Sequence, residues 1–259
     1  MKRIVTALAL IPIVVYVVLW ANFWAFLAVL VTVAFLCYRE FDGIAQAYGF
    51  GAPGPIGYGA GLLLLVWWQE TRLPIWLLAV GIALILLALA MHGDDLAKSL
   101  PRAALLLAGI VYVFGCWKCA IPLRELNPHW LMYALLVNWV GDMGAFYVGR
   151  RWGRHKMAPR VSPNKSWEGA AASVVASVLI AGAYLLRFVP GVAVAQAVAL
   201  TVAANAAGQL GDLTESAMKR GAGVKDSGTM LPGHGGFLDR VDSTLFSLPL
   251  IYAWLKLAG

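Results

Sequence analysis

Long apolar runs, separated by short polar breaks, occupy most of the chain. Each run is bounded by glycine, proline or charged residues, and several approach the roughly 20 residues that a helix needs to cross a bilayer. The pattern predicts about nine membrane-spanning helices, some of them short, near residues 4–20, 23–37, 56–68, 74–91, 103–122, 131–148, 168–189, 192–210 and 244–258. We therefore expect an all-α polytopic membrane protein, whose first run stays as an anchor rather than a cleaved signal peptide.

Composition and charge support this prediction and orient it. Hydrophobic residues make up 61% of the chain and charged residues 13%, which differs from the balance of a soluble domain. With nine spans, fifteen of the 20 lysines and arginines fall on the side of the N-terminus. The other side receives Arg72, Arg124, Arg187 and Lys256, and Lys118 lies within a span. The positive-inside rule then predicts a cytoplasmic N-terminus, with a short turn at Ala21 and Asn22 between the first two helices.

The net charge of +7 has the same explanation, because basic loops on one membrane face are the ordinary result of topology. We therefore expect no nucleic-acid partner. One loop is richer in basic residues than the others, since residues 150–165 contain six lysines or arginines. Such a loop favours anionic lipid headgroups or a nucleotide. The three cysteines lie in apolar contexts, and we expect them to pack rather than to bind metal.

The 13 acidic residues are unevenly placed and more informative. Those of the first half mostly flank spans, so topology explains them: Glu40, Asp42, Glu70, Asp94, Asp95 and Glu125. The others lie beside glycine, lysine or arginine: Asp142, Glu168, Asp212, Glu215, Asp226, Asp239 and Asp242. Asp142 and Asp212 interrupt or end apolar helices, where a charge marks a functional site unless the helix simply ends at the membrane surface.

The spacing of these acids predicts a site formed by two helix ends. Asp212 lies four residues before Ser216, and Glu215 lies four before Lys219, so all four can share one helix face. The pair in LDRVD, residues 238–242, repeats the three-residue spacing of two carboxylates. If the two ends converge, their oxygens suit a hard cation such as Mg²⁺, which takes its remaining ligands from water and phosphates. The alternative is two unrelated helix caps that pair with nearby basic residues.

The connection between these helices favours the first interpretation. Residues 221–236, GAGVKDSGTMLPGHGG, contain six glycines, a proline and a histidine, which is too polar for lipid. Glycines let backbone N–H groups approach a phosphate, and Lys225 and His234 can add charge or donors. No Walker motif is present. The combination predicts a cation and phosphate site at the inner membrane face.

The stretch SAMKRGAGVKDSGTMLPGHGGFLDRVD, residues 216–242, resembles the signature of the phosphatidate cytidylyltransferases, also called CDP-diacylglycerol synthases. That pattern asks for Ser, Lys-Arg, Lys-Asp, a small residue, Pro or Gly, His-Gly-Gly and Asp-Arg-x-Asp at fixed spacings. The matching residues are Ser216, Lys219, Arg220, Lys225, Asp226, Gly228, Pro232, His234, Gly235, Gly236, Asp239, Arg240 and Asp242. GDLTES and residues 141–169 also resemble the family, although Asn164 and Ser166 stand where Lys and Thr are expected. The resemblance divides the chain into an N-terminal transmembrane region, 1–130, and a C-terminal catalytic region, 131–259.

The resemblance implies transfer of CMP from CTP to phosphatidic acid, giving CDP-diacylglycerol and pyrophosphate for phospholipid biosynthesis. It implies Mg²⁺, a second, monovalent cation, a homodimer, and a site on the cytoplasmic face of a bacterial-type inner membrane. Catalytic roles fall to Asp212, Lys219, Asp239 and Asp242, and the three aspartates are the implied metal ligands. The implied substrate-binding residues are Ser162, Lys165, Ser216, Arg220, Lys225, His234, Gly235 and Gly236, with Asp142, Glu168 and Glu215 as supports.

Two other classes are weighed against this prediction. A CDP-alcohol phosphatidyltransferase would carry DGxxAR followed by GxxxDxxxD, and the nearest match, Asp42 to Gln46, breaks off. A carrier could use Asn138, Asp142, Asn205 and Gln209 to line a path across the membrane. The chain shows no internal repeat, and a carrier has no evident need of the signature segment.

Overall fold

The computed structural model describes residues 2–50, 54–67, 75–90, 96–230 and 235–258, and in these ranges the protein is nearly all helical. Seven uninterrupted helices are α1 (Lys2–Leu19), α2 (Phe23–Ala47), α3 (Gly54–Val66), α4 (Ile75–Ala90), α8 (Pro128–Trp152), α11 (Val194–Gly221) and α12 (Leu238–Ala258). Two further rods are built from consecutive pieces that include a π-helical turn. The first joins η1 (Leu96–Lys98), α5 (Ser99–Gly109), η2 (Ile110–Gly115), α6 (Cys116–Lys118) and α7 (Ala120–Leu126), and the second joins α9 (Trp167–Ser177), η3 (Val178–Gly182) and α10 (Ala183–Phe188). Each predicted apolar run corresponds to one of these rods, so the all-α prediction is confirmed.

Four of these rods are long and apolar enough to cross a membrane, judged by length and composition: Phe23–Ala47, Ser99–Leu126, Pro128–Trp152 and Trp167–Phe188. The apolar parts of α1 and α3 are shorter. Many outward-facing side chains are large and apolar, among them Leu84, Ile85, Leu179 and Ile180, as expected for helices in contact with lipid. The structure is therefore membrane-like, while the count of nine spans stays a prediction.

The predicted break between the first two helices is confirmed. The side-chain oxygen of Asn22 accepts a hydrogen bond from Ala25 N at 2.8 Å and caps the start of α2. Arg124 Nε donates to Val18 O at 2.9 Å, which ties the end of α1 to the rod ending at Leu126. The chain therefore turns sharply here instead of continuing as one long helix.

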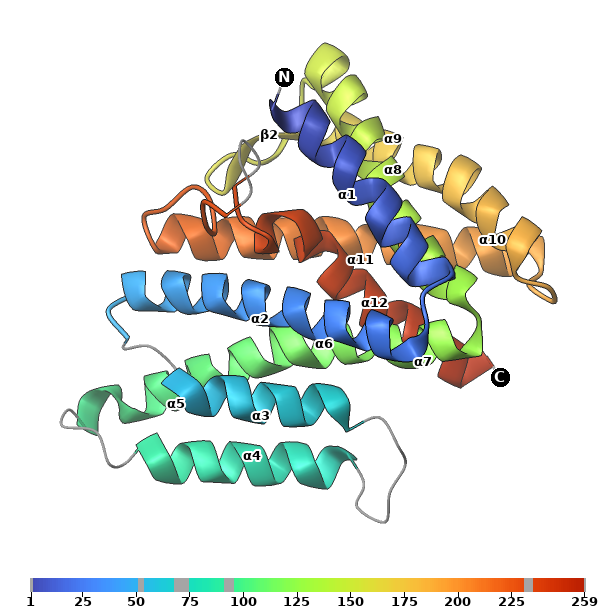
Figure 1. Ribbon diagram of the computed structural model, residues 1–259. Helices are drawn as coiled ribbons and strands as arrows, with labels where there is room; N and C mark the ends of the chain where they lie inside the picture. Colours follow the sequence, from blue (N-terminus) through green and yellow to red (C-terminus); the bar gives the residue numbers. More distant parts are fainter. Residues whose placement is uncertain (1, 51–53, 68–74, 91–95, 231–234, 259) are drawn as a thin grey trace.

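α2, α3 and α4 run side by side across the view in Figure 1, with α5 in contact with α2 and α4. α1 and α8 run at a steep angle to them. The core between α2, α3 and η2 is aromatic: the Tyr38 ring lies 4.9 Å from Tyr58 and 5.1 Å from Phe114 between centroids. A Cβ at Gly61 would lie 2.1 Å from the Phe114 ring, so this glycine lets α3 approach closely.

The basic loop at 150–165 departs from the all-α prediction. It folds into an antiparallel hairpin of β1 (Lys156–Ala158) and β2 (Ser162–Ser166), which pairs Lys156 with Ser166 and Ala158 with Ser162 around an irregularity. The strands are polar and lack apolar alternation, so no periodic pattern predicted them. Ser166 Oγ then accepts from Gly169 N at 3.2 Å and caps α9, which fixes the end of the hairpin against that helix.

Candidate active site

A polar cavity of about 480 Å³ lies between α8, α9, α11, α12 and the hairpin. The charged side chains that line it are Asp142, Lys165, Asp212, Lys219, Asp226, Asp239, Arg240 and Asp242. Most come from two helix ends separated in sequence by the glycine-rich segment, with Lys165 added by β2. The structure thus brings three of the four predicted acids, Asp212, Asp239 and Asp242, to one cavity, while Glu215 contacts Lys219 behind them.

Asp212 forms the α11 side of the site. Its Oδ2 lies 2.6 Å from Lys165 Nζ, so the basic hairpin supplies the partner of this carboxylate. Ser216 Oγ, one helical turn further along α11, donates to Asp212 Oδ1 at 3.3 Å. Lys165 and Asp212 are both partly exposed to the cavity, so both can be reached by a bound anion or cation.

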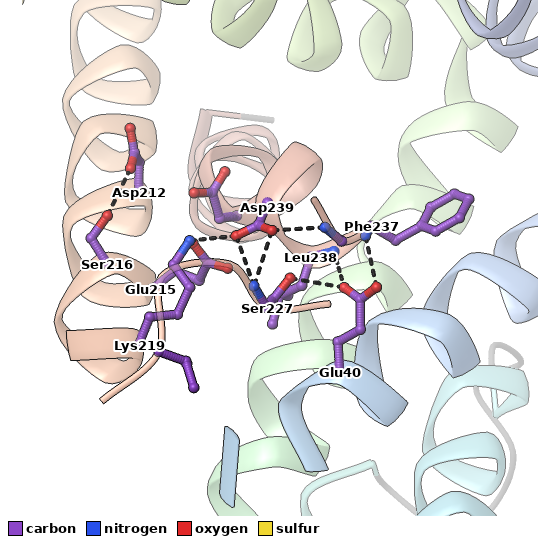
Figure 2. Close-up of polar contacts among 12 residues, drawn as sticks. Glu40, Asp212, Glu215, Ser216, Lys219, Ser227, Phe237, Leu238 and Asp239 are labelled. Carbon is purple, nitrogen blue, oxygen red and sulfur yellow. Dashed lines mark hydrogen bonds and ion pairs between the residues drawn. The ribbon is translucent and has the colours of Figure 1, made fainter. Parts of the chain in front are cut away.

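Lys219 is the link between the two helices. Its ammonium group contacts the carboxylates of Glu215, on the same face of α11, and of Asp239, at the start of α12 (Figure 2). Burial alone would lower the pKa of Lys219, but the two acids outweigh it and raise that pKa. Burial raises the pKa of Glu215 to about 7, although Lys219 opposes the shift. These groups lie near the end of α11 and the start of α12, outside the four rods that are long and apolar enough to cross a membrane.

Asp239 is held by backbone donors as well as by Lys219. Gly236 N donates to Oδ2 at 2.8 Å, and Ser227 N donates to the same oxygen at 3.0 Å (Figure 2). Burial opposes the charged form, but Lys219 and these N–H groups outweigh it, so the pKa of Asp239 is lowered. The carboxylate is therefore charged, fixed in orientation and directed toward the cavity that it lines.

Asp242 lies one turn further along α12 and is buried. Its Oδ1 accepts from Ser243 N at 2.8 Å. Burial, followed by the nearby charges of Asp212 and Glu215, raises its pKa well above the ordinary value. α11 approaches closely here, because a Cβ at Gly211 would lie 2.6 Å from Asp242 O.

This crowding of carboxylates fits a cation. The pKa of Asp242 is raised by burial and by the negative groups around it, and a positive ion among Asp212, Asp239 and Asp242 would relieve that repulsion. Within the described residues, no three carboxylate, histidine or cysteine side chains are grouped closely enough to form a ready-made metal centre. Lys165 and Lys219 hold Asp212 and Asp239 instead.

The other predicted substrate-binding residues are less central. Arg220 does not line the cavity, and its guanidinium donates to Val161 O at 3.3 Å and Val224 O at 3.0 Å, which joins the hairpin to the end of α11. Lys225 is exposed, and Ser162 begins β2. His234 lies outside the described residues.

The two glycines of the signature turn, Gly235 and Gly236, lie against acidic side chains. Gly235 adopts a left-handed backbone conformation with φ of 77°, and a Cβ there would lie 2.6 Å from Asp239 Oδ2. Gly236 supplies an N–H group to that same carboxylate. Gly235 is therefore required in order to hold Asp239, whereas at Gly236 a Cβ would clash with Glu40 and Ser227.

The three predicted supports have different surroundings. Asp142 extends from α8 into the cavity. Glu168 accepts from His155 N at 3.2 Å and lies 2.6 Å from His155 Nδ1, so it holds the entrance of the hairpin rather than lining the cavity. Glu215 contacts Lys219. Of the three, Asp142 and Glu215 touch the cavity or a residue that lines it.

Amide side chains form the inner wall of the cavity. Asn205 Nδ2 donates to Ser173 and Ser177 at 2.9 Å each, and Gln209 Nε2 donates to Asn205 Oδ1 at 2.6 Å. Asn138 Nδ2 donates to Ser247 Oγ at 2.8 Å. These bonds join α8, α9, α11 and α12, so the polar residues inside the membrane-like part hold the helices that carry the acids.

Sequence reasoning missed Glu40. We attributed it to topology at the end of a span, yet it is buried on α2 and accepts hydrogen bonds from Ser227, Phe237 and Leu238 beside the site. A sequence signal existed, because Glu40 shares a helix face with the buried Cys37 and Ile44. An acid on a buried face requires partners, and these partners belong to the signature segment.

Comparison with known proteins identifies the family of the chain. The chain is 41% identical over 150 residues to the phosphatidate cytidylyltransferase of Bacillus subtilis, which covers 57% of this chain and 56% of that protein. It is 40% identical over 153 residues to that of Staphylococcus saprophyticus and 43% identical over 154 residues to that of Staphylococcus haemolyticus, in each case over 59% of both chains. The matched part therefore spans less than two thirds of these relatives. The model of the cytidylyltransferase family matches residues 1–258, and the chain belongs to this family.

Proposed function

We propose that the protein is a CTP:phosphatidate cytidylyltransferase, which transfers CMP from CTP to phosphatidic acid. The observation that carries the proposal is the single cavity in which Lys165, Asp212, Lys219, Asp239 and Asp242 meet. Relatives that match over more than half of this chain bear that enzyme's name, and the whole chain matches the family.

The proposed chemistry needs alignment and charge neutralisation rather than a protein nucleophile. An oxygen of the lipid phosphate attacks the α-phosphorus of CTP, the bond from that phosphorus to the bridging oxygen breaks, and pyrophosphate leaves in line. Lys165 and Lys219, which line the cavity together with Arg240, would neutralise phosphate oxygens. Ser216 and the turn at Gly235 and Gly236 would shape the binding site around them.

Asp212, Asp239 and Asp242 would hold Mg²⁺, which supplies positive charge to the triphosphate when it is bound. The first two acids now pair with Lys165 and Lys219. A cation and the two ammonium groups compete for the same oxygens, so the proposal requires both lysines to turn toward the phosphates. A second, monovalent cation, which the family resemblance implies, is part of the same proposal, and Asp142 and Asp226 are the acids of the cavity lining that would remain for it.

An apolar cavity beside the polar one favours a lipid substrate. It measures about 320 Å³ and lies between α1, α2, α8 and α12, with Val14, Val33 and Leu135 among its walls. Asp142 and Arg240 line both cavities, so the apolar space adjoins the acids directly. An acyl chain in this space would bring its phosphate headgroup to Arg240 and the lysines, while CTP enters from the aqueous side.

Both alternative classes receive less support from the structure. Asp42, which would begin the phosphatidyltransferase motif, pairs with Gln46 at 3.2 Å and does not line the polar cavity. Asn138 and Asn205, which a carrier would use, donate to neighbouring helices as described above. The proposal places the N-terminus and the cavity on the cytoplasmic side of a bacterial-type inner membrane, and the homodimer implied by the family stays a prediction.

The test is incorporation of radiolabelled CTP into lipid by the purified protein, with phosphatidic acid and with or without Mg²⁺. We expect labelled CDP-diacylglycerol and pyrophosphate in the presence of Mg²⁺. Asp239→Asn should nearly abolish pyrophosphate release while the protein stays folded in detergent, because the charged carboxylate is lost. Full activity in that variant contradicts the assigned role, and no lipid product from the wild type contradicts the function.

A further inference from the structure

Glu40 connects the N-terminal half of the protein to the start of α12. It lies on α2 with 5% of its surface exposed. Its three hydrogen-bond partners follow 187 to 198 residues later in the chain. A buried carboxylate is unfavourable unless its oxygens are satisfied, and here each oxygen has at least one donor.

Two of these three bonds, from Phe237 and Leu238, cap the start of α12. Phe237 N donates to Glu40 Oε1 at 3.0 Å, and Leu238 N donates to Oε2 at 2.8 Å (Figure 2). The first N–H groups of a helix lack partners within that helix, and its N-terminus favours a negative charge. A carboxylate from another helix meets both needs, so it fixes where α12 begins and in which direction it runs.

The third bond, from Ser227, connects Glu40 to the first half of the glycine-rich segment. Ser227 Oγ donates to Glu40 Oε2 at 2.9 Å, while Ser227 N donates to Asp239 at 3.0 Å (Figure 2). Ser227 is thus fixed between the two acids. Asp239 directly follows Leu238, whose N–H group Glu40 also binds, so Glu40 acts on Asp239 by two separate routes.

Two glycines of the signature segment are explained by the same carboxylate. A Cβ at Gly228 would lie 2.6 Å from Glu40 Oε1, and one at Gly236 would lie 2.2 Å from Oε2. Both distances are too short for a side chain, and Glu40 is enclosed and cannot easily move away. The segment is therefore shaped to receive Glu40.

We infer that Glu40 is a positioning residue of the active site, which sets the start of α12 and thereby the orientation of Asp239 toward Lys219 and the cavity. The inference rests on the proposed function, because that function makes Asp239 catalytic. Glu40 lines neither cavity in the described part of the chain, so it acts through Asp239 and not on a substrate.

The experiment compares Glu40→Gln with Asp42→Asn in the purified full-length protein. Both changes replace a buried acid of α2 by its amide, but Asp42 bonds to Gln46 of its own helix and not to α12. In Glu40→Gln an NH2 group replaces one of the two carboxylate oxygens. Because each oxygen accepts from a backbone N–H group, the change places two donors against each other and removes a hydrogen bond. We measure kcat and the KM for CTP, and we follow amide hydrogen exchange in peptides covering residues 235–242 and, as an internal reference, 194–208.

We expect Glu40→Gln to lower kcat roughly 10- to 100-fold, as for a catalytic group misplaced by about 1 Å, with the KM for CTP changed by less than about threefold. Glu40→Asp should be intermediate, and Asp42→Asn close to wild type. Exchange should become faster at 235–242 and stay unchanged at 194–208.

Two results would overturn the inference: a kcat within about twofold of wild type in Glu40→Gln, or faster exchange throughout both peptides together with the loss of activity. If Glu40→Gln does not fold, Glu40→Asp gives the same comparison. If the wild type makes no lipid product, the proposed function fails, but the exchange pattern still decides whether Glu40 holds the start of α12.

Discussion

Replacing Lys219 by methionine tests the charge balance at the centre of the site. The change removes the ammonium group that contacts both Glu215 and Asp239 and keeps an unbranched side chain. The side chains of Lys219, Glu215 and Asp239 are only 9%, 1% and 5% exposed. Removing one partner of a buried ion pair leaves an uncompensated charge and destabilises a protein by about 3–5 kcal/mol.

Lys165 provides the matched control in the same cavity. Its pair with Asp212 is more open to water, with side chains 22% and 32% exposed. Such pairs contribute about 0.2–1 kcal/mol. Lys165→Met should therefore reduce the unfolding free energy far less than Lys219→Met, although both variants should lose CTP-dependent activity.

The effect of Lys219→Met should also depend on pH. The pKa of Glu215 is raised from its ordinary 4.5 to about 7 in the folded protein. Between these values the folded state keeps a proton that the unfolded chain has released, so this group makes stability fall as pH rises. Without Lys219 the pKa of Glu215 in the folded protein rises further, so the free energy of unfolding continues to fall above pH 7. The loss of unfolding free energy in Lys219→Met, relative to wild type, should therefore be larger at pH 8 than at pH 6.

Thermal unfolding in detergent, followed by circular dichroism at both pH values, measures these differences. We expect Lys219→Met to lower the melting temperature on the order of 10 °C at pH 8, and Lys165→Met to lower it only slightly. The double variant Lys219→Met/Glu215→Gln should recover much of the stability, because it removes one of the unpaired acids, but none of the activity. Equal melting temperatures for the two single variants would refute the reasoning, as would a larger deficit at pH 6.

Two further predictions test the cation and the lipid. Mg²⁺ at about ten times its Kd should stabilise the wild type by about 1.4 kcal/mol and raise its melting temperature by a few degrees. The melting temperature of Asp242→Asn should rise less. An equal rise with choline chloride of the same ionic strength would indicate that Mg²⁺ acts by charge screening alone. Val33→Trp, which fills the apolar cavity, should raise the KM for phosphatidic acid about 5- to 10-fold and leave the KM for CTP unchanged. Thr32→Trp, on the exposed side of α2, is its control, and a rise in the KM for CTP alone would contradict the lipid assignment.

Sequence predicted that the two helix ends would meet, but the individual contacts that it predicted lie within one helix. The four-residue spacing of α11 placed Ser216 beside Asp212 and Lys219 beside Glu215, and both contacts are present. The apolar runs located the helices because a helix that lies against neighbours and lipid is apolar on all sides, so its sequence is a continuous apolar run. Local spacing is encoded directly, and it needs no knowledge of the fold.

The contacts between elements could not be read in the same way. Acid and base spacing left open whether the two helix ends carry unrelated caps, and the structure answers through Lys219, which contacts acids of both. The pairing of Lys165 with Asp212 depends on a hairpin without an apolar pattern. The contacts of Glu40 were the hardest to predict, because its partners are set by the packing of α2 against α12.

The glycine-rich segment changes its meaning once these contacts are known. From its composition we expected backbone N–H groups exposed to a phosphate. Two of those groups are already used, because Ser227 and Gly236 donate to Asp239, and the next two along the chain, of Phe237 and Leu238, donate to Glu40. In its described parts the segment therefore binds carboxylates of the protein itself. In the proposed function, side chains that line the cavity therefore meet much of the charge of an incoming triphosphate, and Lys165 and Lys219, each of which now contacts an aspartate, are central to that role.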